Sequence, residues 1–274
     1  MQSQTLLAIS LLLGSTFLSP AADGPKPLRA LLITGGCCHD YAKQKDILKE
    51  GLEARAHVVV DQIHTDDKST KPPLAILGNA DYAKGYDVVI HDECSADISD
   101  PAVIAAVLAP HRKGIPGVNL HCAMHSYRVG NPGTRAEPGE ERAAWFEYLG
   151  IQSSSHGPQE PIGIMFVDSE HPITKGLTDW FTIKEELYNN VQILPGTVAL
   201  ARGTQVFKQK DGTSKGVGAV VAWANEYRKT RVFSTTIGHN NATVSDARYL
   251  DLVTRGLLWS CGKLEKDYLK PAVK

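Results

Sequence analysis

Short apolar runs alternate with longer mixed stretches along the first half of this chain. The runs cover 28–33, 56–61, 86–90 and 115–120, and each has the length and composition of a strand buried on both faces. Between them, 41–55 has helical composition, and Asp100-Pro101 supplies an N-cap and a first-turn proline for a second helix. Strands that alternate with helices predict an α/β fold with a doubly wound, mostly parallel, flavodoxin-like sheet.

The second half of the chain continues the pattern with less regularity. Further strands are predicted at 161–168, 197–201, 218–224 and 231–237, and a helix is predicted to contain Trp145 and Tyr148. The stretch 246–260 predicts an amphipathic helix. Residues 128–142 are rich in glycine, proline and charge, which favours a surface insertion over the site. With no repeat or linker, we expect one domain over 28–262, followed by a tail at 263–274.

Composition narrows the range of partners. The 274 residues carry a formal net charge of −1, with 42% hydrophobic and 22% charged residues. This balance argues against nucleic acid and against an anionic membrane surface as partners. We therefore expect a small, weakly charged ligand, and the chain is also compatible with a homo-oligomer.

The N-terminal 22 residues differ from the rest. Leu6 to Leu18 is apolar and is followed by Ser19-Pro20-Ala21-Ala22, which resembles the apolar region and small-residue cleavage site of a signal peptide. The apolar stretch is too short to span a bilayer comfortably, and no later segment is long and apolar enough. We therefore expect export to the periplasm or the extracellular space, without stable membrane insertion after cleavage.

The segment 114–126, GIPGVNLHCAMHS, predicts a strand that enters a tight turn and then a helix. Such an elbow displays one residue at the carboxyl edge of the sheet and needs small side chains two positions before and after it. Displaying Cys122 would place Leu120 and Met124 at these crowded positions, whereas displaying His121 places Asn119 and Ala123 there. The sequence therefore favours His121 at the turn, with Cys122 buried against the sheet as a small hydrophobic side chain.

The five cysteines are Cys37, Cys38, Cys94, Cys122 and Cys261. An odd number leaves at least one free thiol in an exported protein, and no spacing matches a zinc ribbon or a redox CxxC motif. Cys37, Cys94 and Cys122 each fall near the carboxyl end of a predicted strand. One disulfide among these three and a set of buried thiols are both compatible with the pattern.

Several segments in order resemble the trehalose-utilisation (ThuA-like) family, a branch of the class I glutamine amidotransferase-like superfamily. They are ITGGCCHDY at 33–41, GVNLHCAMHS at 117–126, HPITKGL at 171–177, FTIKEELY at 181–188, VVAWANEYRKTRVFSTTIGHN at 220–240 and YLDLVTRGLLWSCG at 249–262. The resemblance implies a flavodoxin-like sheet whose elbow carries histidine in place of the amidotransferase cysteine. It also implies a role in sugar catabolism, notably in routes through 3-keto-glycosides. The chain departs from many relatives in having Glu185-Glu186 where they have Asp-Glu.

Three histidines follow predicted strand ends: His39, His121 and His239. If the strands neighbour one another, their imidazoles face one crevice, where they could bind a metal or act as bases near neutral pH. His121 and His125 are four apart, so a helix starting at the elbow would project them from one face as ligands of a divalent metal such as zinc. Glu186, His39 or His239 could then supply a third ligand.

Glu186 lies in an apolar setting that could raise its carboxyl pKa and suit it to acid–base chemistry. We select Glu186 over Glu185, for which a solvated charge pair with Lys184 is a live alternative. The candidate catalytic residues are therefore His121, Glu186, His39 and His239. The candidate sugar-binding residues are His125, Tyr188, Glu93, His156 and Asn240.

The leading hypothesis is an exported enzyme that acts on a glycoside or its 3-keto derivative through proton transfer by His121 or Glu186. Hydrolase, lyase and isomerase chemistry all remain open. The alternative is a non-catalytic sugar-binding or metal-binding protein on the same fold. The elbow argument disfavours a thiol glutamine amidotransferase.

Overall fold

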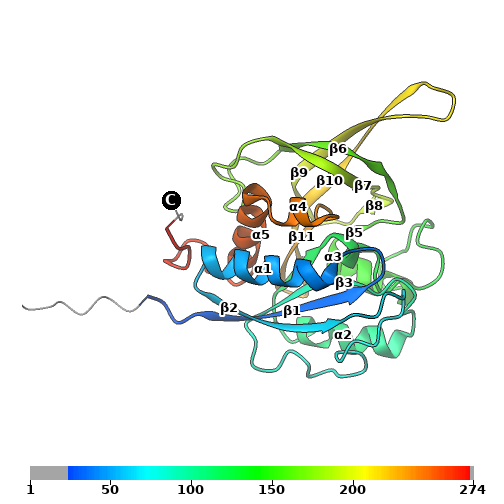
Figure 1. Ribbon diagram of the computed structural model, residues 1–274. Helices are drawn as coiled ribbons and strands as arrows, with labels where there is room; N and C mark the ends of the chain where they lie inside the picture. Colours follow the sequence, from blue (N-terminus) through cyan, green and yellow to red (C-terminus); the bar gives the residue numbers. More distant parts are fainter. Residues whose placement is uncertain (1–23, 272–274) are drawn as a thin grey trace, which may run out of the picture.

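The computed structural model describes residues 24–271 (Figure 1). The predicted signal peptide at 1–22 lies outside these residues. Within residues 24–271, none of the helices combines the length and apolar character needed to cross a bilayer.

The first half of the chain builds the parallel part of a nine-stranded sheet. Its strands are β2 (Val58–Thr65), β1 (Leu28–Gly36), β3 (Val88–Cys94), β4 (Gly117–Leu120) and β11 (Thr230–Thr235), in this spatial order. All neighbouring pairs among them are parallel. The predicted alternation of strands and helices is thus confirmed, and the carboxyl ends of these five strands share one edge of the sheet.

The sheet continues beyond β11 with antiparallel strands. These are β10 (Ser214–Tyr227), β9 (Val198–Lys208), β6 (His156–Phe166) and β7 (Trp180–Tyr188), while β5 (Ile151–Gln152) and β8 (Gln192–Ile193) pair separately. The reversal begins at Arg228-Lys229, where both residues have positive φ, as a tight hairpin turn requires. The sheet is therefore mixed, and Figure 1 shows the β9–β10 hairpin projecting from the body.

Helices cover both faces of the parallel part. On one face lie α1 (Tyr41–Arg55) and α5 (Ala247–Ser260), and on the other lie α2 (Pro101–Arg112) and α3 (Ala144–Leu149). Alternate residues of β1 serve the two cores: Leu32 packs beneath α1 and α5, and Leu31 packs with α2 and α3. Figure 1 shows α1 and α2 on opposite sides of β1.

The predicted surface insertion at 128–142 is largely irregular, with a short 3-10 turn at Glu141–Ala143. The side-chain amide of Gln152 in β5 donates to the carbonyl oxygens of Pro132 and Thr134, which fastens this insertion to the smaller sheet. The tail follows α5 and meets the C-terminal end of α1, where the Lys270 N–H donates to the carbonyl of Arg55.

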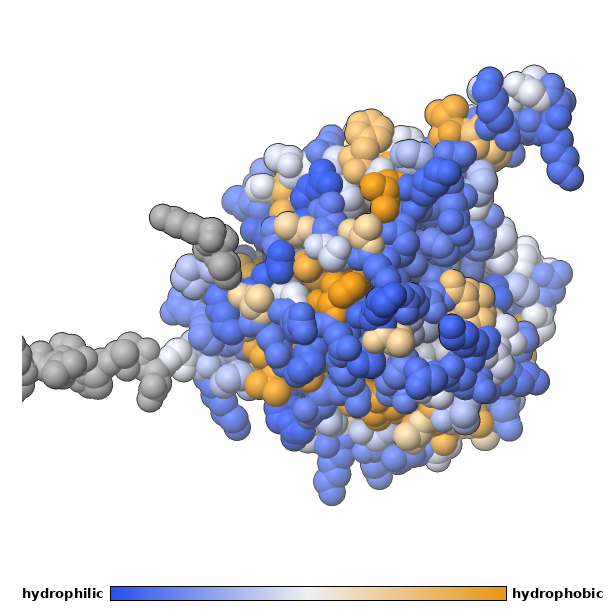
Figure 2. All heavy atoms as spheres, viewed as in Figure 1, coloured by the Kyte–Doolittle hydropathy of each residue, from blue (hydrophilic) through white to orange (hydrophobic). Residues whose placement is uncertain are grey.

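The visible surface is mainly hydrophilic, with small apolar patches between polar regions (Figure 2). The most exposed large apolar side chains, Phe181, Val206 and Ile183, belong to β7 and β9 in the antiparallel part. Assembly of the chain into a homo-oligomer stays a prediction.

Candidate functional site

Three imidazoles meet at the carboxyl edge of the parallel strands. His39 follows β1, His121 follows β4 and His239 follows β11. The ring centroids of His39 lie 4.6 Å from His121 and 4.9 Å from His239. One ring nitrogen from each residue lies within 4.8 Å of the others. The structure therefore brings together the three histidines that the sequence places at strand ends.

Two glycines shape the loops that carry His39 and His239. Gly36 has a φ of +101°, and a side chain there would overlap the carbonyl oxygen of Cys94. Gly238 has a φ of +132°, and a Cβ atom there would lie 2.9 Å from the Tyr249 hydroxyl. Both loops thus need the left-handed freedom and small size of glycine to bring the following histidine over the strand ends.

His121 occupies the strained position of the elbow, with a φ of +41° that is rare for a residue with a side chain. Asn119, two residues earlier, is buried and donates to the Ser234 hydroxyl at 3.0 Å. Ala123, two residues later, is fully buried. The prediction that His121, and not Cys122, occupies the turn is confirmed.

The segment after the elbow is a 3-10 helix, His121–His125. The predicted ligand pair requires a helix that places positions four apart on one face. At three residues per turn, such positions point about 120° apart. His125 accordingly turns away from the cluster. One of its ring nitrogens lies 2.9 Å from the Ser153 hydroxyl, and its ring stacks on Tyr188 at 4.2 Å. The structure does not bring His121 and His125 together as a ligand pair.

Glu186 lies among the imidazoles. Its carboxylate oxygens are 3.6 Å from His121 Nε2, 3.4 Å from His239 Nδ1 and 3.6 Å from His156 Nε2. Burial opposes ionisation of this carboxyl group, but the neighbouring imidazoles of His121 and His239 outweigh burial and lower its pKa. The expectation that an apolar setting raises the Glu186 pKa is therefore wrong. Because its immediate neighbours are imidazoles, the carboxylate is ionised at neutral pH.

Two side chains that form hydrogen bonds at the histidine cluster were not predicted from the sequence. Glu185 is fully buried, and its carboxylate accepts from the backbone N–H of His239 at 3.1 Å. Gln159 Nε2 lies 2.8 Å from His239 Nε2 and donates to Glu186 at 3.2 Å. The neighbouring Glu186 carboxylate also raises the pKa of His239. No local pattern separates Glu185 or Gln159 from ordinary polar strand residues, because their partners come from distant loops.

Backbone carbonyls orient two of the imidazoles. His121 Nδ1 lies 2.7 Å from the Thr236 carbonyl oxygen, and His39 Nδ1 lies 3.2 Å from the His239 carbonyl oxygen. A carbonyl only accepts, so Nδ1 of each ring carries a proton, and in a neutral ring this leaves Nε2 as the electron-pair donor. Burial, together with the neighbouring histidines, lowers the pKa of His39 to about 2, so this ring is neutral at physiological pH.

The cluster therefore gathers electron-pair donors. In its neutral form His121 carries on Nε2 a lone pair that faces the Glu186 carboxylate, and His39 contributes a further neutral ring. Facing lone pairs repel one another unless a proton or a cation lies between them. Histidine nitrogens fixed by carbonyl hydrogen bonds at Nδ1 are typical metal ligands. The residues present thus fit a divalent cation held by His39, His121 and His239, with Glu186 beside it.

A hollow of about 440 Å³ lies next to the cluster. His39, His239 and Asn240 contribute to its lining, together with Cys38 and Lys68. This hollow is open to solvent, is lined mainly by polar residues and is large enough for a small molecule. The histidine cluster is therefore accessible from one side through His39 and His239.

Three other predicted sugar-binding residues lie at different places around the histidine cluster. Tyr188 is buried, with its hydroxyl 3.5 Å from His121 Nε2, and the partly exposed His156 lies on the far side of Glu186. Asn240 lines the hollow and caps the short helix α4 (Asn241–Val244) by accepting from Thr243 N–H.

Glu93 lies in the protein interior. Its Oε1 accepts from the Tyr127 hydroxyl at 2.7 Å and lies 2.8 Å from His91 Nδ1. Residue 93 is on the same face of β3 as Val89, which packs in the core beneath α2. The structure therefore does not bring Glu93 to the histidine cluster.

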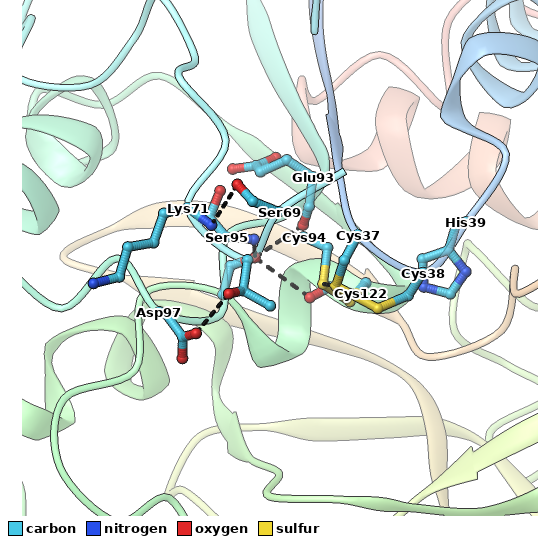
Figure 3. Close-up of a disulfide and its surroundings, with 12 residues drawn as sticks. Cys37, Cys38, His39, Ser69, Lys71, Glu93, Cys94, Ser95, Asp97 and Cys122 are labelled. Atoms are coloured by element: carbon cyan, nitrogen blue, oxygen red, sulfur yellow. Dashed lines mark hydrogen bonds between the residues drawn. A yellow bond between two sulfur atoms is a disulfide. The ribbon is translucent and has the colours of Figure 1, made fainter. Parts of the chain in front are cut away.

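Of the two alternatives that the sequence left open, a disulfide among Cys37, Cys94 and Cys122 is present, and the set of buried thiols is not. Cys94 and Cys122 form one disulfide, and Cys37 and Cys38 form another (Figure 3). Cys122 is buried as expected, but it is not a free hydrophobic thiol, because the elbow brings it to the end of β3. Cys261 is the free cysteine. With its sulfur in a disulfide, Cys122 is not available as an amidotransferase nucleophile.

Comparisons with known proteins place these features in context. The family model described as ThuA, trehalose utilisation, matches residues 29–260. A putative ThuA-like protein from Parabacteroides merdae is 22% identical, with 88% of this chain and 92% of that chain covered and a TM-score of 0.61. One from Bacteroides uniformis is 17% identical, with 88% and 95% covered and a TM-score of 0.58.

A beta-galactosidase from Rahnella sp. R3 contains a similar fold within a longer chain. It is 14% identical, with 86% of this chain but 31% of that chain covered, and the TM-score is 0.53. Comparison with curated protein sequences gave no match. At these identities the solved structures establish the fold alone.

Proposed function

Because the chain belongs to the ThuA family, whose description refers to trehalose utilisation, we propose that it is a metal-dependent enzyme acting on a glycoside or 3-keto-glycoside. The substrate class comes from the family resemblance. The histidine cluster and Glu186 support the proposed chemistry.

The observation that carries the proposal is the convergence of three imidazoles beside a carboxylate. Ring nitrogens of His39, His121 and His239 lie within 4.8 Å of one another, beside an ionised carboxylate. Carbonyl partners at Nδ1 orient the first two rings, which keeps their lone pairs in place without a ligand. This preorganisation costs backbone strain at His121, and such strain is typical of functional sites.

Glu186 is suited to act as the base. Its carboxylate lies among the imidazoles, in position to accept a proton from a sugar hydroxyl or from carbon next to a ketone. Gln159 donates to one carboxylate oxygen and holds the group in position. The Tyr188 hydroxyl, close to His121, is a donor to an oxygen that develops negative charge. A bound divalent cation would polarise the substrate oxygen.

We further propose that this activity is located outside the cytoplasm. The signal-like composition of residues 1–22 supports export. The two disulfides support an oxidising compartment as well, because disulfides persist mainly in such environments. N-terminal sequencing of the protein recovered from the periplasm or medium tests this, and an intact Met1 on all of the protein would contradict it.

The central test combines metal analysis with turnover. We expect purified protein to carry a divalent metal, measured by elemental analysis, and to consume a 3-keto-glycoside. His121→Ala should lose both the metal and the turnover. His156→Gln is the matched control, because His156 contacts Glu186 from outside the cluster and is partly exposed. That variant should keep its metal.

Two results would contradict the proposal. Metal-free protein with full turnover would exclude the cation. Stabilisation by sugars or metal without turnover of glycosides or keto-glycosides would favour a binding protein on the same fold. Circular dichroism of His121→Ala establishes that any loss does not come from unfolding.

A further inference from the structure

Four cysteines converge beside the histidine cluster, where the loop after β1 meets the end of β3 and the elbow. Figure 3 shows the sulfur atoms of Cys37, Cys38, Cys94 and Cys122 gathered together, with His39 next to them. The two disulfides are in contact, because Cys37 Sγ lies 3.4 Å from Cys94 Sγ. The chain thus holds two adjacent disulfides, one near the surface and one in the interior.

The two disulfides differ in access. Cys38 is exposed and lines the hollow of about 440 Å³, whereas Cys37 is half-buried. Cys94 and Cys122 are buried and pack against Tyr41. A reagent in the hollow can therefore reach the outer disulfide at Cys38, but not the inner one. Lys68 lines the same hollow, and its positive charge favours an approaching thiolate.

We propose that this cluster is a thiol–disulfide exchange site for a small dithiol, in which reduction of the outer disulfide is passed to the inner one. The 3.4 Å contact between Cys37 and Cys94 is the point of transfer. This activity is separate from the proposed sugar chemistry and uses none of its histidines.

The exchange proceeds in three displacements at sulfur. A thiolate of the dithiol attacks Cys38 Sγ, the Cys37–Cys38 bond breaks, and Cys37 leaves as a thiolate. The Cys37 thiolate attacks Cys94 Sγ, so a Cys37–Cys94 bond forms while Cys122 leaves and takes up a proton. The second thiol of the reagent, after losing its proton, attacks the mixed disulfide at the reagent's own sulfur.

The last displacement releases oxidised reagent and a Cys38 thiolate, which takes up a proton. The dithiol loses two electrons and the protein gains them, ending with one disulfide and two new thiols. The final disulfide is Cys37–Cys94, and the new thiols are on Cys38 and Cys122. In the relay the second new protein thiol is on Cys122, whereas simple reduction of the outer disulfide would leave it on Cys37.

The first experiment treats the full oxidised chain with dithiothreitol, quenches with acid, and alkylates under denaturing conditions. Peptide mapping by mass spectrometry then locates each modified cysteine. We expect Cys38 and Cys122 to be alkylated in equal amounts, together with a Cys37–Cys94 disulfide. Cys261, which is free from the start, serves as the internal standard. Alkylation of Cys37 and Cys38 with Cys94–Cys122 intact would overturn the relay.

A matched pair of variants tests the transfer step without reductant. Cys38→Ser leaves Cys37 as a thiol next to Cys94, so we expect alkylation at Cys122. Cys37→Ser leaves the thiol on the exposed Cys38, and we expect alkylation there with the inner disulfide retained. Cys122 unmodified in folded Cys38→Ser protein, with Cys37 carrying all of the label, would refute the transfer.

Discussion

His121 Nδ1 lies 2.7 Å from the carbonyl oxygen of Thr236, in the loop after β11. This contact links the elbow to the strand that neighbours β4, and it leaves His121 Nε2 directed toward Glu186. Ring orientation is thus set by backbone that does not depend on substrate. The site is preorganised, and its chemistry should be sensitive to the groups that face Nε2.

Replacement of Glu186 is the sharpest test of the proposed base. Glu186→Gln keeps the shape of the side chain but removes the negative charge and the proton-accepting carboxylate. We expect kcat on a 3-keto-glycoside to fall by about 10²- to 10⁴-fold, the usual contribution of a general base. Steady-state kinetics measure the change, and metal analysis should show that the cation is retained through the three histidines.

Glu185→Gln is the matched control for that variant. Glu185 accepts a hydrogen bond from the backbone N–H of His239, and a glutamine oxygen can accept the same bond. We therefore expect a much smaller loss of kcat. Equal losses in the two variants would mean that the paired carboxylates support the loop and that neither acts as the base.

Metal removal should lower stability as well as activity. A cation present at about 100 times its Kd stabilises the folded state by about 2.7 kcal/mol, which corresponds to roughly 5–10 °C in Tm for a domain of this size. We expect chelation to lower Tm by this amount and added metal to restore it, as measured by scanning calorimetry. His39→Ala should show no such response, and an equal response in that variant would place the cation elsewhere.

The sequence predicted the arrangement of the histidines because topology determines it. Alternating strands and helices imply parallel pairing, and parallel strands bring their carboxyl ends to one edge, so His39 and His121 fall on the same edge even though β3 separates β1 from β4. The elbow prediction relied on an equally local rule, the small side chains at Asn119 and Ala123. Both inferences depend only on composition and spacing within short segments.

Other features depend on contacts that spacing does not encode. Glu186 has an apolar local sequence, but its pKa is lowered by His121 and His239, which come from other elements. The direction of His125 depends on whether the elbow continues as an α-helix or a 3-10 helix. The partner of Cys122 depends on how closely the elbow approaches the end of β3, a distance that no motif predicts.

Gly36 should be more sensitive to alanine than other glycines with positive φ. Gly36→Ala combines an unfavourable backbone conformation with overlap of the new methyl group and the Cys94 carbonyl oxygen. Gly78→Ala provides the control, because Gly78 has a φ of +76° but open space around it. We expect a loss of about 1 kcal/mol for Gly78→Ala and a clearly larger loss for Gly36→Ala, measured by urea unfolding. Equal losses of stability in the two variants would show that the loop after β1 shifts to make room for the methyl group at no further cost.

A buried histidine outside the site predicts a pH dependence of stability. His111 Nδ1 donates to the Ile115 carbonyl at 2.8 Å, and His111 Nε2 lies 3.1 Å from His91 Nε2. Burial, followed by the proximity of His91, lowers the pKa of His111 to about 3 from 6.5. Between these values the unfolded state binds more protons than the folded state, so the folded state loses stability as pH falls from 6.5 toward 3.

The full shift corresponds to about 5 kcal/mol, lost progressively across that window and constant below it. Urea unfolding at a series of pH values measures the slope, and His111→Asn isolates the contribution of this ring from those of other groups. Asparagine can keep the donor to Ile115 but does not titrate. The variant should therefore be less stable at pH 7 and less dependent on pH between 6.5 and 3. An unchanged slope would mean that His111 does not stay neutral in the folded protein over this range.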